Sequence, residues 1–275
     1  MPAPLPIAAF FHGSATISQR LVRCALIGAA SCALAQQPPD VDFREYAKKL
    51  RATSLESLDP QVVPPIGSKR RVQFNDAWKL NIVAGVFTIR GASAWDPEWE
   101  KHYGGFDDPS PEARNGFRPA KFRPGLNPFY VALPYNDVGP DGTKPEARAL
   151  VPWFEEVFER DGKSVLRDRW VMIRKNLPGK RSKFCYAQWS DCGPFVPDQG
   201  DYVFGNALPR WNAAKGQGLS VSPAVRDFLQ MREMDVLDWR FLEINQVPHG
   251  PWAELGANNP LAVKQPDAGA ETERK

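Results

Sequence analysis

Asp191 is the first candidate for a catalytic carboxylate. It lies in the aromatic-rich stretch Tyr-Ala-Gln-Trp-Ser-Asp-Cys-Gly-Pro-Phe (186–195), where a strand-like sequence gives way to a Gly-Pro turn. A carboxylic acid shielded by aromatic walls, here Trp189 and Phe195, can hold the raised pKa that suits a general acid, which delivers its proton to a leaving group. An Asp before Gly-Pro is also a common turn former that accepts backbone N–H groups. The stretch therefore predicts either a general acid or a carboxylate that fixes a turn.

Short strands are the elements that must position this carboxylate. β-branched and aromatic residues between turn residues predict strands; the candidate runs are 80–95, 129–135, 169–176, 182–190, 201–205 and 238–244. The runs 169–176 and 182–190 flank a Leu-Pro-Gly turn and predict a hairpin. Helical patterns are confined mainly to 152–162 and to 222–231, where Ser222 can cap the helix and Pro223 takes its first position. Many short strands within roughly 180 residues predict a mainly β fold, a closed or nearly closed barrel.

The first 35 residues have the pattern of a secretory signal peptide. Arg20 and Arg23 precede a small and apolar run, and Ala33-Leu34-Ala35 forms an A-x-A cleavage site. The run is too short to span a membrane. Cleavage after Ala35 predicts export to the periplasm or the extracellular space. Lipid attachment at Cys32 is the less favoured alternative, since small Ala29 lies where a lipid-attachment motif prefers a larger aliphatic residue.

The remainder divides into three parts. Residues 36–75 form an N-terminal extension, with a predicted amphipathic helix at 45–58 and a proline-rich linker after it. The barrel domain is expected at 76–252, with an insertion near 136–166. Residues 253–275 are polar and low in aromatics, which predicts a disordered C-terminal tail.

Cysteine, histidine and charge restrict the class of function. Cleavage after Ala35 would leave only Cys185 and Cys192, and an even pair in an exported protein predicts a disulfide if the chain reverses between them; two free thiols are the alternative. Spacing typical of zinc ligands is absent and only His102 and His249 would remain, so we expect neither a metal site nor a cofactor. The mature chain would carry 33 basic and 32 acidic residues without a basic stripe, which gives no support to nucleic-acid binding. Oligomeric state leaves no sequence signal.

The stretch 169–231 resembles the rare lipoprotein A and expansin-like group of double-psi β-barrels. RWVMIRKN, a turn, KFCYAQWSDCGPF and then GLSVSPAVRDFLQM follow the order of that family's strands and helix, and 191–195 match its Asp-x-Gly-Pro-Phe motif. Upstream, 91–97 is similar to the family's first strand, and 132–134 to part of its second. The resemblance implies a six-stranded double-psi β-barrel. It also implies an exported, cell-wall-facing protein whose groove handles polysaccharide, peptidoglycan foremost.

Several site residues follow from the resemblance. The carboxylate at Asp191 is implicated in catalysis by the family's lytic transglycosylases, and Asp96 follows an aromatic as in the barwin-like cellulases, with a turn cap in Trp-Asp-Pro as its alternative. Two positions depart from the pattern. Ser220 stands where cellulases and expansins carry an acid, which disfavours an inverting two-carboxylate hydrolase. Tyr130 stands where rare lipoprotein A has a His, and Tyr is a weak proton carrier at neutral pH.

Aromatic residues supply the expected substrate surface. Flat apolar rings suit sugar faces, and we expect Trp95, Trp99 and Trp211 to be exposed platforms because they lie in loop-like sequence. The other expected groove residues are Tyr130, Trp189, Phe195 and Asp201, with core packing or an ordinary loop as their alternative roles. Two functions stay open: a lytic transglycosylase using Asp191, and a non-catalytic, expansin-like polysaccharide-binding module.

Overall fold

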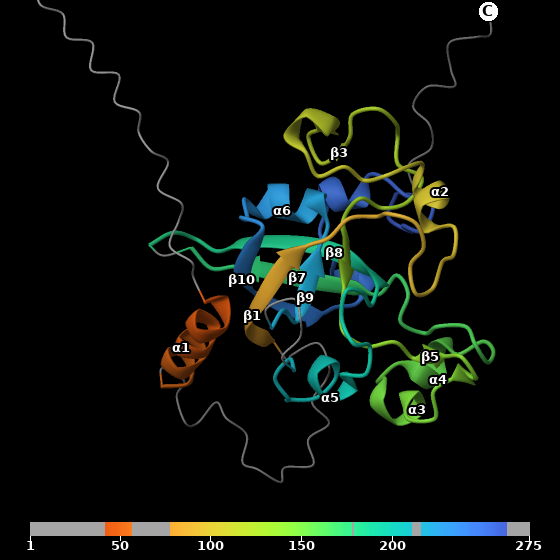
Figure 1. Cartoon of the computed structure of the whole chain (residues 1–275), viewed down its shortest axis with the longest axis horizontal. Coiled ribbons are helices and arrows are strands. Elements are labelled where there is room, and N and C mark those ends of the chain that lie inside the picture. Colours follow the sequence, from red (N-terminus) through yellow and green to blue (C-terminus); the bar gives the residue numbers. More distant parts are fainter. Residues whose placement is uncertain (1–41, 57–77, 178, 211–215, 263–275) are drawn as a thin grey trace, which may run out of the picture. The chain divides into compact units, whose positions relative to one another are not determined.

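The structure, a computed structural model, describes residues 42–56, 78–177, 179–210 and 216–262 (Figure 1). Six strands close into a barrel in the order β1-β10-β7-β8-β4-β9. Their bounds are β1 Lys79–Val86, β4 Tyr130–Ala132, β7 Trp170–Lys175, β8 Lys183–Asp191, β9 Leu219–Val221 and β10 Met234–Phe241. The expected mainly β class and the closed barrel are confirmed.

The barrel mixes parallel and antiparallel pairs. β1 pairs in parallel with β9 and β4 in parallel with β8, while the other four neighbouring pairs are antiparallel. The predicted hairpin is present as β7 and β8, with Trp170 opposite Gln188 and Lys175 opposite Lys183. Strand β8 therefore pairs with β7 over residues 183–188 and with β4 over residues 188–191, and it carries Asp191 at its end.

The barrel interior is filled by large rings. Trp189 and Trp239 are fully buried, and Phe241 packs against both, with ring centroids 5.8 and 5.1 Å apart. Phe204 stacks on Phe241 at 5.9 Å. Burial of rings of this size is the main apolar contribution to the core, and it fixes the strands that lead to the end of the barrel where Asp191 lies.

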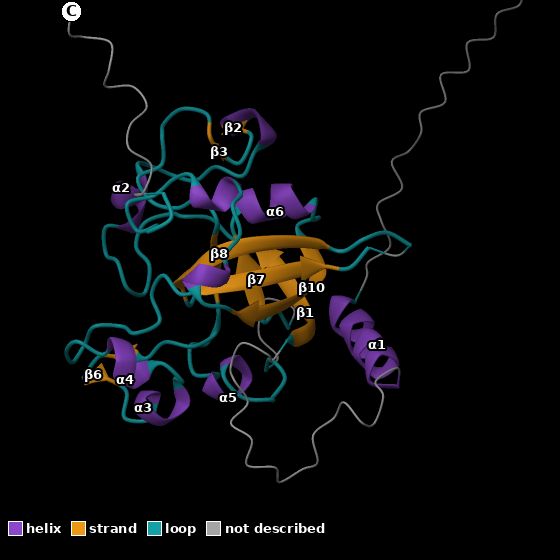
Figure 2. Cartoon of the chain, turned by 180° about the vertical axis from the view of Figure 1, so that it is seen from behind, coloured by secondary structure: helices purple, strands orange, loops and turns teal. Residues whose placement is uncertain are grey.

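Short helices and hairpins surround the barrel (Figure 2). The helices are α1 Phe43–Glu56, α2 Trp99–Tyr103, α3 Ala147–Leu150, α4 Phe154–Val157, α5 Gly200–Val203 and α6 Pro223–Leu229. The 3-10 helices are η2 Pro111–Ala113, η3 Ile244–Gln246 and η4 Pro251–Ala253. Two small hairpins join β2 Arg114–Asn115 to β3 Arg118–Pro119, and β5 Val138–Gly139 to β6 Gly142–Thr143. The predicted insertion near 136–166 thus holds β5, β6, α3 and α4.

Helix α6 begins as the sequence predicts, whereas α5 does not. The Ser222 hydroxyl accepts a hydrogen bond from the Val225 N–H at 3.2 Å, and Pro223 opens α6. The predicted strand 201–205 is wrong, because these residues begin in α5. Tyr202 is buried there, donating its hydroxyl to the Gly218 carbonyl at 3.0 Å. A run of five residues is too short for its apolar pattern to distinguish a strand from a helical turn.

The folded part continues past the predicted boundary at Trp252. Ala253 and Asn259 are buried, and the Asn259 amide donates to the carbonyl groups of Trp252 and Leu255. Residues 253–262 therefore belong to the barrel domain, and the tail predicted at 253–275 began too early. Its remainder, like the signal peptide with Cys32, lies outside the described residues. Among the helices described, none is long and apolar enough to cross a membrane.

Candidate functional site

Asp191 is held by backbone N–H groups at the end of β8. Its Oδ1 accepts from the Ala94 N–H at 2.9 Å, and the Cys192 and Gly193 N–H groups also bond to it. The side chain is half-buried, and this burial raises its pKa above the ordinary value although the three backbone hydrogen bonds oppose the shift. Both roles expected for Asp191 are therefore compatible with its geometry: it fixes a turn, and it keeps a raised pKa.

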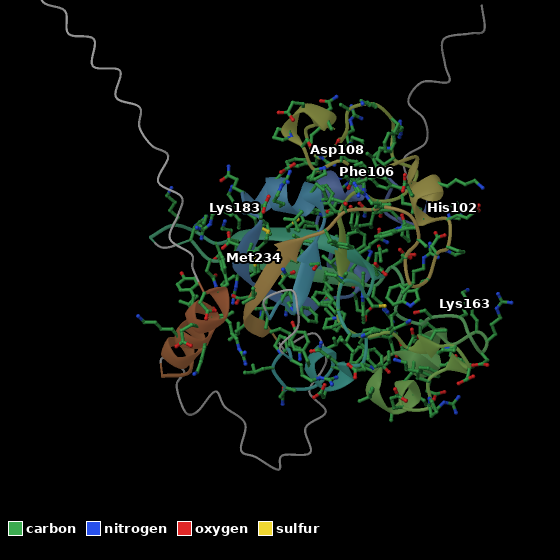
Figure 3. The ribbon with its side chains drawn as sticks, viewed as in Figure 1. His102, Phe106, Asp108, Lys163, Lys183 and Met234 are labelled. Carbon is green, nitrogen blue, oxygen red and sulfur yellow. The ribbon has the colours of Figure 1, made fainter. Side chains whose placement is uncertain are left out.

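Asp96 lies nearby but has a different character. Only 4% of it is exposed, and its Oδ2 lies 2.8 Å from His102 Nδ1 and 2.9 Å from Arg167 Nη2. Burial alone would raise its pKa, but the hydrogen bonds from His102, the Glu98 N–H and Arg167 together lower it. Asp96 is thus an ionised anchor joining α2 to the loop before β7, and a poor proton donor at neutral pH. His102 lies on α2 (Figure 3).

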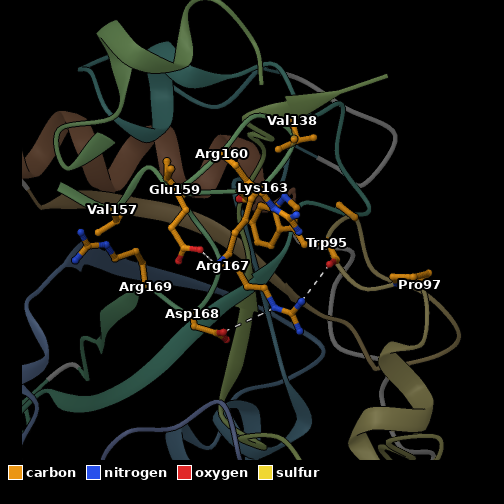
Figure 4. A pocket seen from close by; sticks show the side chains of 14 residues that line it. Trp95, Pro97, Val138, Val157, Glu159, Arg160, Lys163, Arg167, Asp168 and Arg169 are labelled. Carbon is orange, nitrogen blue, oxygen red and sulfur yellow. Dashed lines mark hydrogen bonds and ion pairs between the residues drawn. The ribbon is translucent and has the colours of Figure 1, made fainter. Parts of the chain in front are cut away.

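A cavity of about 610 Å³ opens beside Trp95 (Figure 4). Ala94, Trp95 and Pro97 form one side, and much of the remaining lining comes from residues 157–169. The Trp95 indole is half-buried: its Nε1 donates to Asn136 Oδ1 at 2.7 Å, and its ring meets that of Trp189 edge to face at 5.7 Å. The lining is strongly charged, with Arg160, Lys163, Arg167, Arg169, Glu159 and Asp168.

Asp168 is a cavity carboxylate that the sequence did not indicate. Its backbone is left-handed, with φ at 66°, a conformation that costs a non-glycine residue free energy. Oδ1 accepts from Asn258 Nδ2 at 2.7 Å, and Oδ2 lies 3.7 Å from Arg167 Nε. Burial raises its pKa, with the charge of Asp96 adding to the effect, while Asn258 and Arg167 oppose it. The sequence Arg-Asp-Arg at 167–169 is typical of exposed charged residues on a protein surface. It therefore gives no indication of a site at Asp168.

Three residues expected to face substrate are instead in the core. Trp99, Tyr130 and Trp189 are 4%, 1% and 0% exposed, so protein atoms cover their rings and no sugar can stack on them. The Tyr130 hydroxyl donates to the buried Asp107 carboxylate at 2.7 Å and accepts from the Ile89 N–H at 3.1 Å. The Tyr at this position therefore connects the loop after β1 to β4.

The other expected groove residues divide differently. Phe195 is 8% exposed, so it presents little surface. Asp201 is exposed on α5 and does not line the cavity beside Trp95. Trp211 lies outside the described residues. Of the expected platforms, Trp95 is the one that the structure places at a cavity.

The predicted disulfide is wrong, because Cys185 and Cys192 are free and buried. Strand β8 extends through Asp191 without reversing, and at about 3.3 Å per residue it carries the two thiols roughly 20 Å apart, far beyond bonding distance. Burial raises the pKa of both thiols, which keeps them protonated and unreactive. No cluster of three or more metal-ligating side chains occurs among the residues that the structure describes.

The sequence matches no model of a known protein family, and no curated protein matches it either. The function must therefore be argued from the site itself. Its parts are a carboxyl in the cavity wall, the indole of Trp95 beside it, and the half-buried carboxyl of Asp191, which does not line the cavity itself but binds the backbone of Ala94, a lining residue. Such a set can bind a polar ring and transfer protons, the two requirements of glycan cleavage.

Proposed function

We propose that this protein is exported, binds cell-wall polysaccharide at the barrel end that carries Asp191 and Trp95, and cleaves it as a lytic transglycosylase. Peptidoglycan is the first candidate for the polymer. The observation that supports this proposal most is the raised pKa of a half-buried Asp191 beside the loop that carries Trp95. The order of the six barrel strands is also compatible with a double-psi β-barrel, the fold that the resemblance implies.

Asp191 acts as the general acid in this proposal. Its carboxyl proton moves to the glycosidic oxygen, the bond from C1 to that oxygen breaks, and a hydroxyl of the same sugar bonds to C1 and gives up its own proton. A raised pKa keeps more of the carboxyl protonated near neutral pH, where an ordinary Asp is almost entirely ionised. The rate should therefore fall as pH rises through the pKa of Asp191.

Glycan binding is assigned to the cavity and the indole beside it. A volume of about 610 Å³ lies within the usual range for ligand sites. The half-buried Trp95 presents an apolar face, and the surrounding charged side chains can exchange hydrogen bonds with sugar hydroxyls. Arg167 bonds to the Trp95 carbonyl at 3.1 Å, which steadies the loop that holds this ring.

A non-catalytic, expansin-like binding module is the second candidate. It is favoured by two neighbouring residues, Asp96 and Tyr130, that are held by other protein groups and cannot assist Asp191. Asp96 is ion-paired with Arg167 and has a lowered pKa, and Tyr130 is buried against Asp107. Neither can exchange a proton with a bound glycan, so the binding module needs no further assumption about how Asp191 is assisted.

Peptidoglycan digestion separates the two candidates. The purified protein is incubated with glycan strands freed of stem peptides, and soluble anhydro-sugar products are measured by mass spectrometry. Asp191→Asn should abolish release while the protein stays folded and bound. Asp108→Asn is the matched control, since Asp108 lies near β3, apart from the Lys163 end of the cavity (Figure 3). If Asp191→Asn still releases product, Asp191 is not the acid. If the wild-type protein releases no product from any glycan, the protein is a binding module without catalysis.

Binding has its own variant. Trp95→Ala should weaken retention on insoluble peptidoglycan at least several-fold, because it removes the ring at the cavity. Phe184→Ala is the control, since Phe184 is 38% exposed near the opposite end of β8 from Asp191. Equal retention of both variants and the wild type would remove the cavity as the binding site.

A further inference from the structure

We propose that Asp168 is the base of this reaction: it takes the proton of the attacking sugar hydroxyl while Asp191 protonates the leaving oxygen. The inference rests on the proposed function and deepens it, because it divides between two carboxylates the roles that Asp191 would otherwise perform in turn. It also supplies a second carboxylate. This carboxylate lies at a different place in the fold from Ser220, which occupies the position where cellulases and expansins carry theirs. Four features of the structure support it.

The first feature is a bulge that turns Asp168 out of the strand pattern. The Asp168 N–H donates to the Trp189 carbonyl at 2.8 Å, and the Trp189 N–H donates to the Arg169 carbonyl at 2.8 Å. Two consecutive residues thus face a single residue of β8, and the first of them has a left-handed backbone. Such bulges redirect a side chain and are frequent beside active sites. This one places the carboxylate of Asp168 in the cavity wall.

The second feature is that Asp168 is held in place, unlike the other cavity carboxylate. Among the described lining residues two carry a carboxylate, Glu159 and Asp168. Glu159 is 65% exposed in its side chain and pairs with Lys163, four residues later in the same loop, a contact that contributes little to stability. The Asp168 side chain is 30% exposed, and Asn258 binds one of its oxygens while Arg167 lies beside the other. A catalytic base needs such a fixed position with one face open.

The third feature is the connection of Asp168 to Asp191. The segment 94–96 has Asp191 at one end, through the Ala94 N–H, and Asp96 at the other. Arg167 joins Asp96 to Asp168: it lies 2.9 Å from the Asp96 carboxylate and 3.7 Å from that of Asp168, and Figure 4 shows the contact with Asp168. Along β8, the residue that binds the Asp168 backbone precedes Asp191 by two positions. Both carboxylates are therefore tied to the loop that carries Trp95. Asp168 lies in the cavity wall and is joined to this loop through Arg167, and Asp191 binds the backbone of Ala94, which lines the same cavity.

The fourth feature is the charge around Asp168. Arg167 and the Asn258 amide favour its ionised form, whereas burial and the ionised Asp96 favour its protonated form. These opposing influences keep its pKa above that of an ordinary Asp, which makes the carboxylate a better proton acceptor. In the reaction, the proton leaves the attacking hydroxyl for Asp168 and the proton of Asp191 leaves for the glycosidic oxygen. Exchange with water then restores both groups.

The test uses two substitutions that the backbone tolerates. Asn and Gly both accept a left-handed conformation, and Asn also keeps the oxygen that binds Asn258. Asp168→Asn should lower anhydro-sugar release by a factor of about 10² to 10⁴ without a comparable change in glycan affinity. Asp168→Gly leaves space for a small carboxylate, so added sodium formate should restore part of the release. Asp108→Asn is the control and should release product at the wild-type rate, because Asp108 does not line the cavity.

The outcomes distinguish this inference from the proposed function. Wild-type release by Asp168→Asn, in a preparation where Asp191→Asn is inactive, would overturn the role of Asp168 and leave the proposed function standing. Loss of release in Asp168→Gly without any response to formate would assign Asp168 a purely structural role. A wild-type protein that releases nothing from any glycan would overturn both.

Discussion

Replacing Tyr130 by Phe tests whether the structure has assigned this residue its correct role. The change removes one oxygen from a fully buried position, where it donates to Asp107 at 2.7 Å and accepts from the Ile89 N–H at 3.1 Å. Asp107 is itself 0% exposed and pairs with Arg114, so water cannot replace the lost donor. The ring of Phe keeps the contacts of the Tyr ring with Phe87 and Trp99.

The cost follows from the two hydrogen bonds. A bond to a charged or partly charged carboxylate contributes about 1.5–3 kcal/mol, and a buried N–H left without an acceptor costs about 1–3 kcal/mol. Because the two effects concern one oxygen and partly relax together, we expect the free energy of unfolding to fall by about 3–5 kcal/mol. Glycan release and binding by the folded protein should stay unchanged, because Tyr130 has no exposed surface with which to meet substrate.

Guanidinium unfolding followed by tryptophan fluorescence measures the effect, since the chain has 9 Trp residues to report on it. Tyr46→Phe is the control: Tyr46 is 45% exposed on α1, and its loss of a hydroxyl should change stability by less than about 0.5 kcal/mol. A loss below about 1 kcal/mol in Tyr130→Phe would refute the buried network. If Tyr130→Phe releases less product but is as stable as the wild type, then Tyr130 takes part in catalysis.

Three further predictions concern an ion pair, the thiols and a helix cap. Asp96→Asn should lower the free energy of unfolding by about 2 kcal/mol at neutral pH, less than for a fully buried pair because Arg167 keeps 35% of its side-chain surface in water. The folded pKa of Asp96 is lowered, so this contribution is complete above its unfolded pKa of about 3.9 and is lost as pH falls through the folded pKa. The difference in unfolding free energy between the two proteins should therefore be constant from pH 7 to about 5 and shrink as pH falls below about 3.9. Without reductant, iodoacetamide should label Cys185 and Cys192 in the unfolded chain but neither in the folded one, and peptide mass spectrometry showing them joined would contradict the structure. Ser222→Ala should cost about 1 kcal/mol in the same unfolding measurement, and a neutral result would deny the cap of α6.

Local patterns in the sequence identified the elements whose form depends on neighbouring residues. Strands β7 and β8 are joined by a short connection with the sequence Leu-Pro-Gly, and they pair with each other as an antiparallel hairpin. This pairing depends only on residues 170–191. Ser222 and Pro223 start α6 through contacts within three residues. In both cases the residues that decide the structure are close together along the chain, so their types alone are informative.

Features that depend on distant residues could not be predicted in this way. The conformation of Asp168 depends on Trp189 and Asn258, which come 21 and 90 positions later. The disulfide prediction failed because pairing with β7 and β4 keeps the chain extended from Cys185 to Asp191, so it does not reverse between the two thiols. Likewise Tyr202 lies in a short helix because it bonds across to Gly218. Spacing in the sequence carries no record of such contacts.

Closure of the barrel restricts how any partner can be recognised. Each of the six barrel strands has a neighbour on both sides, so this sheet leaves no free edge to which an extended peptide could add as a further strand. Specificity must then reside in side chains on the connecting segments, chiefly 91–98 and 136–169. The sheet holds these segments in place, but its strand pairing does not depend on their side chains. These segments can change their ligand by substitution or lengthening while the hydrogen-bonded framework stays intact, which makes them the natural targets for redesigning what the protein binds.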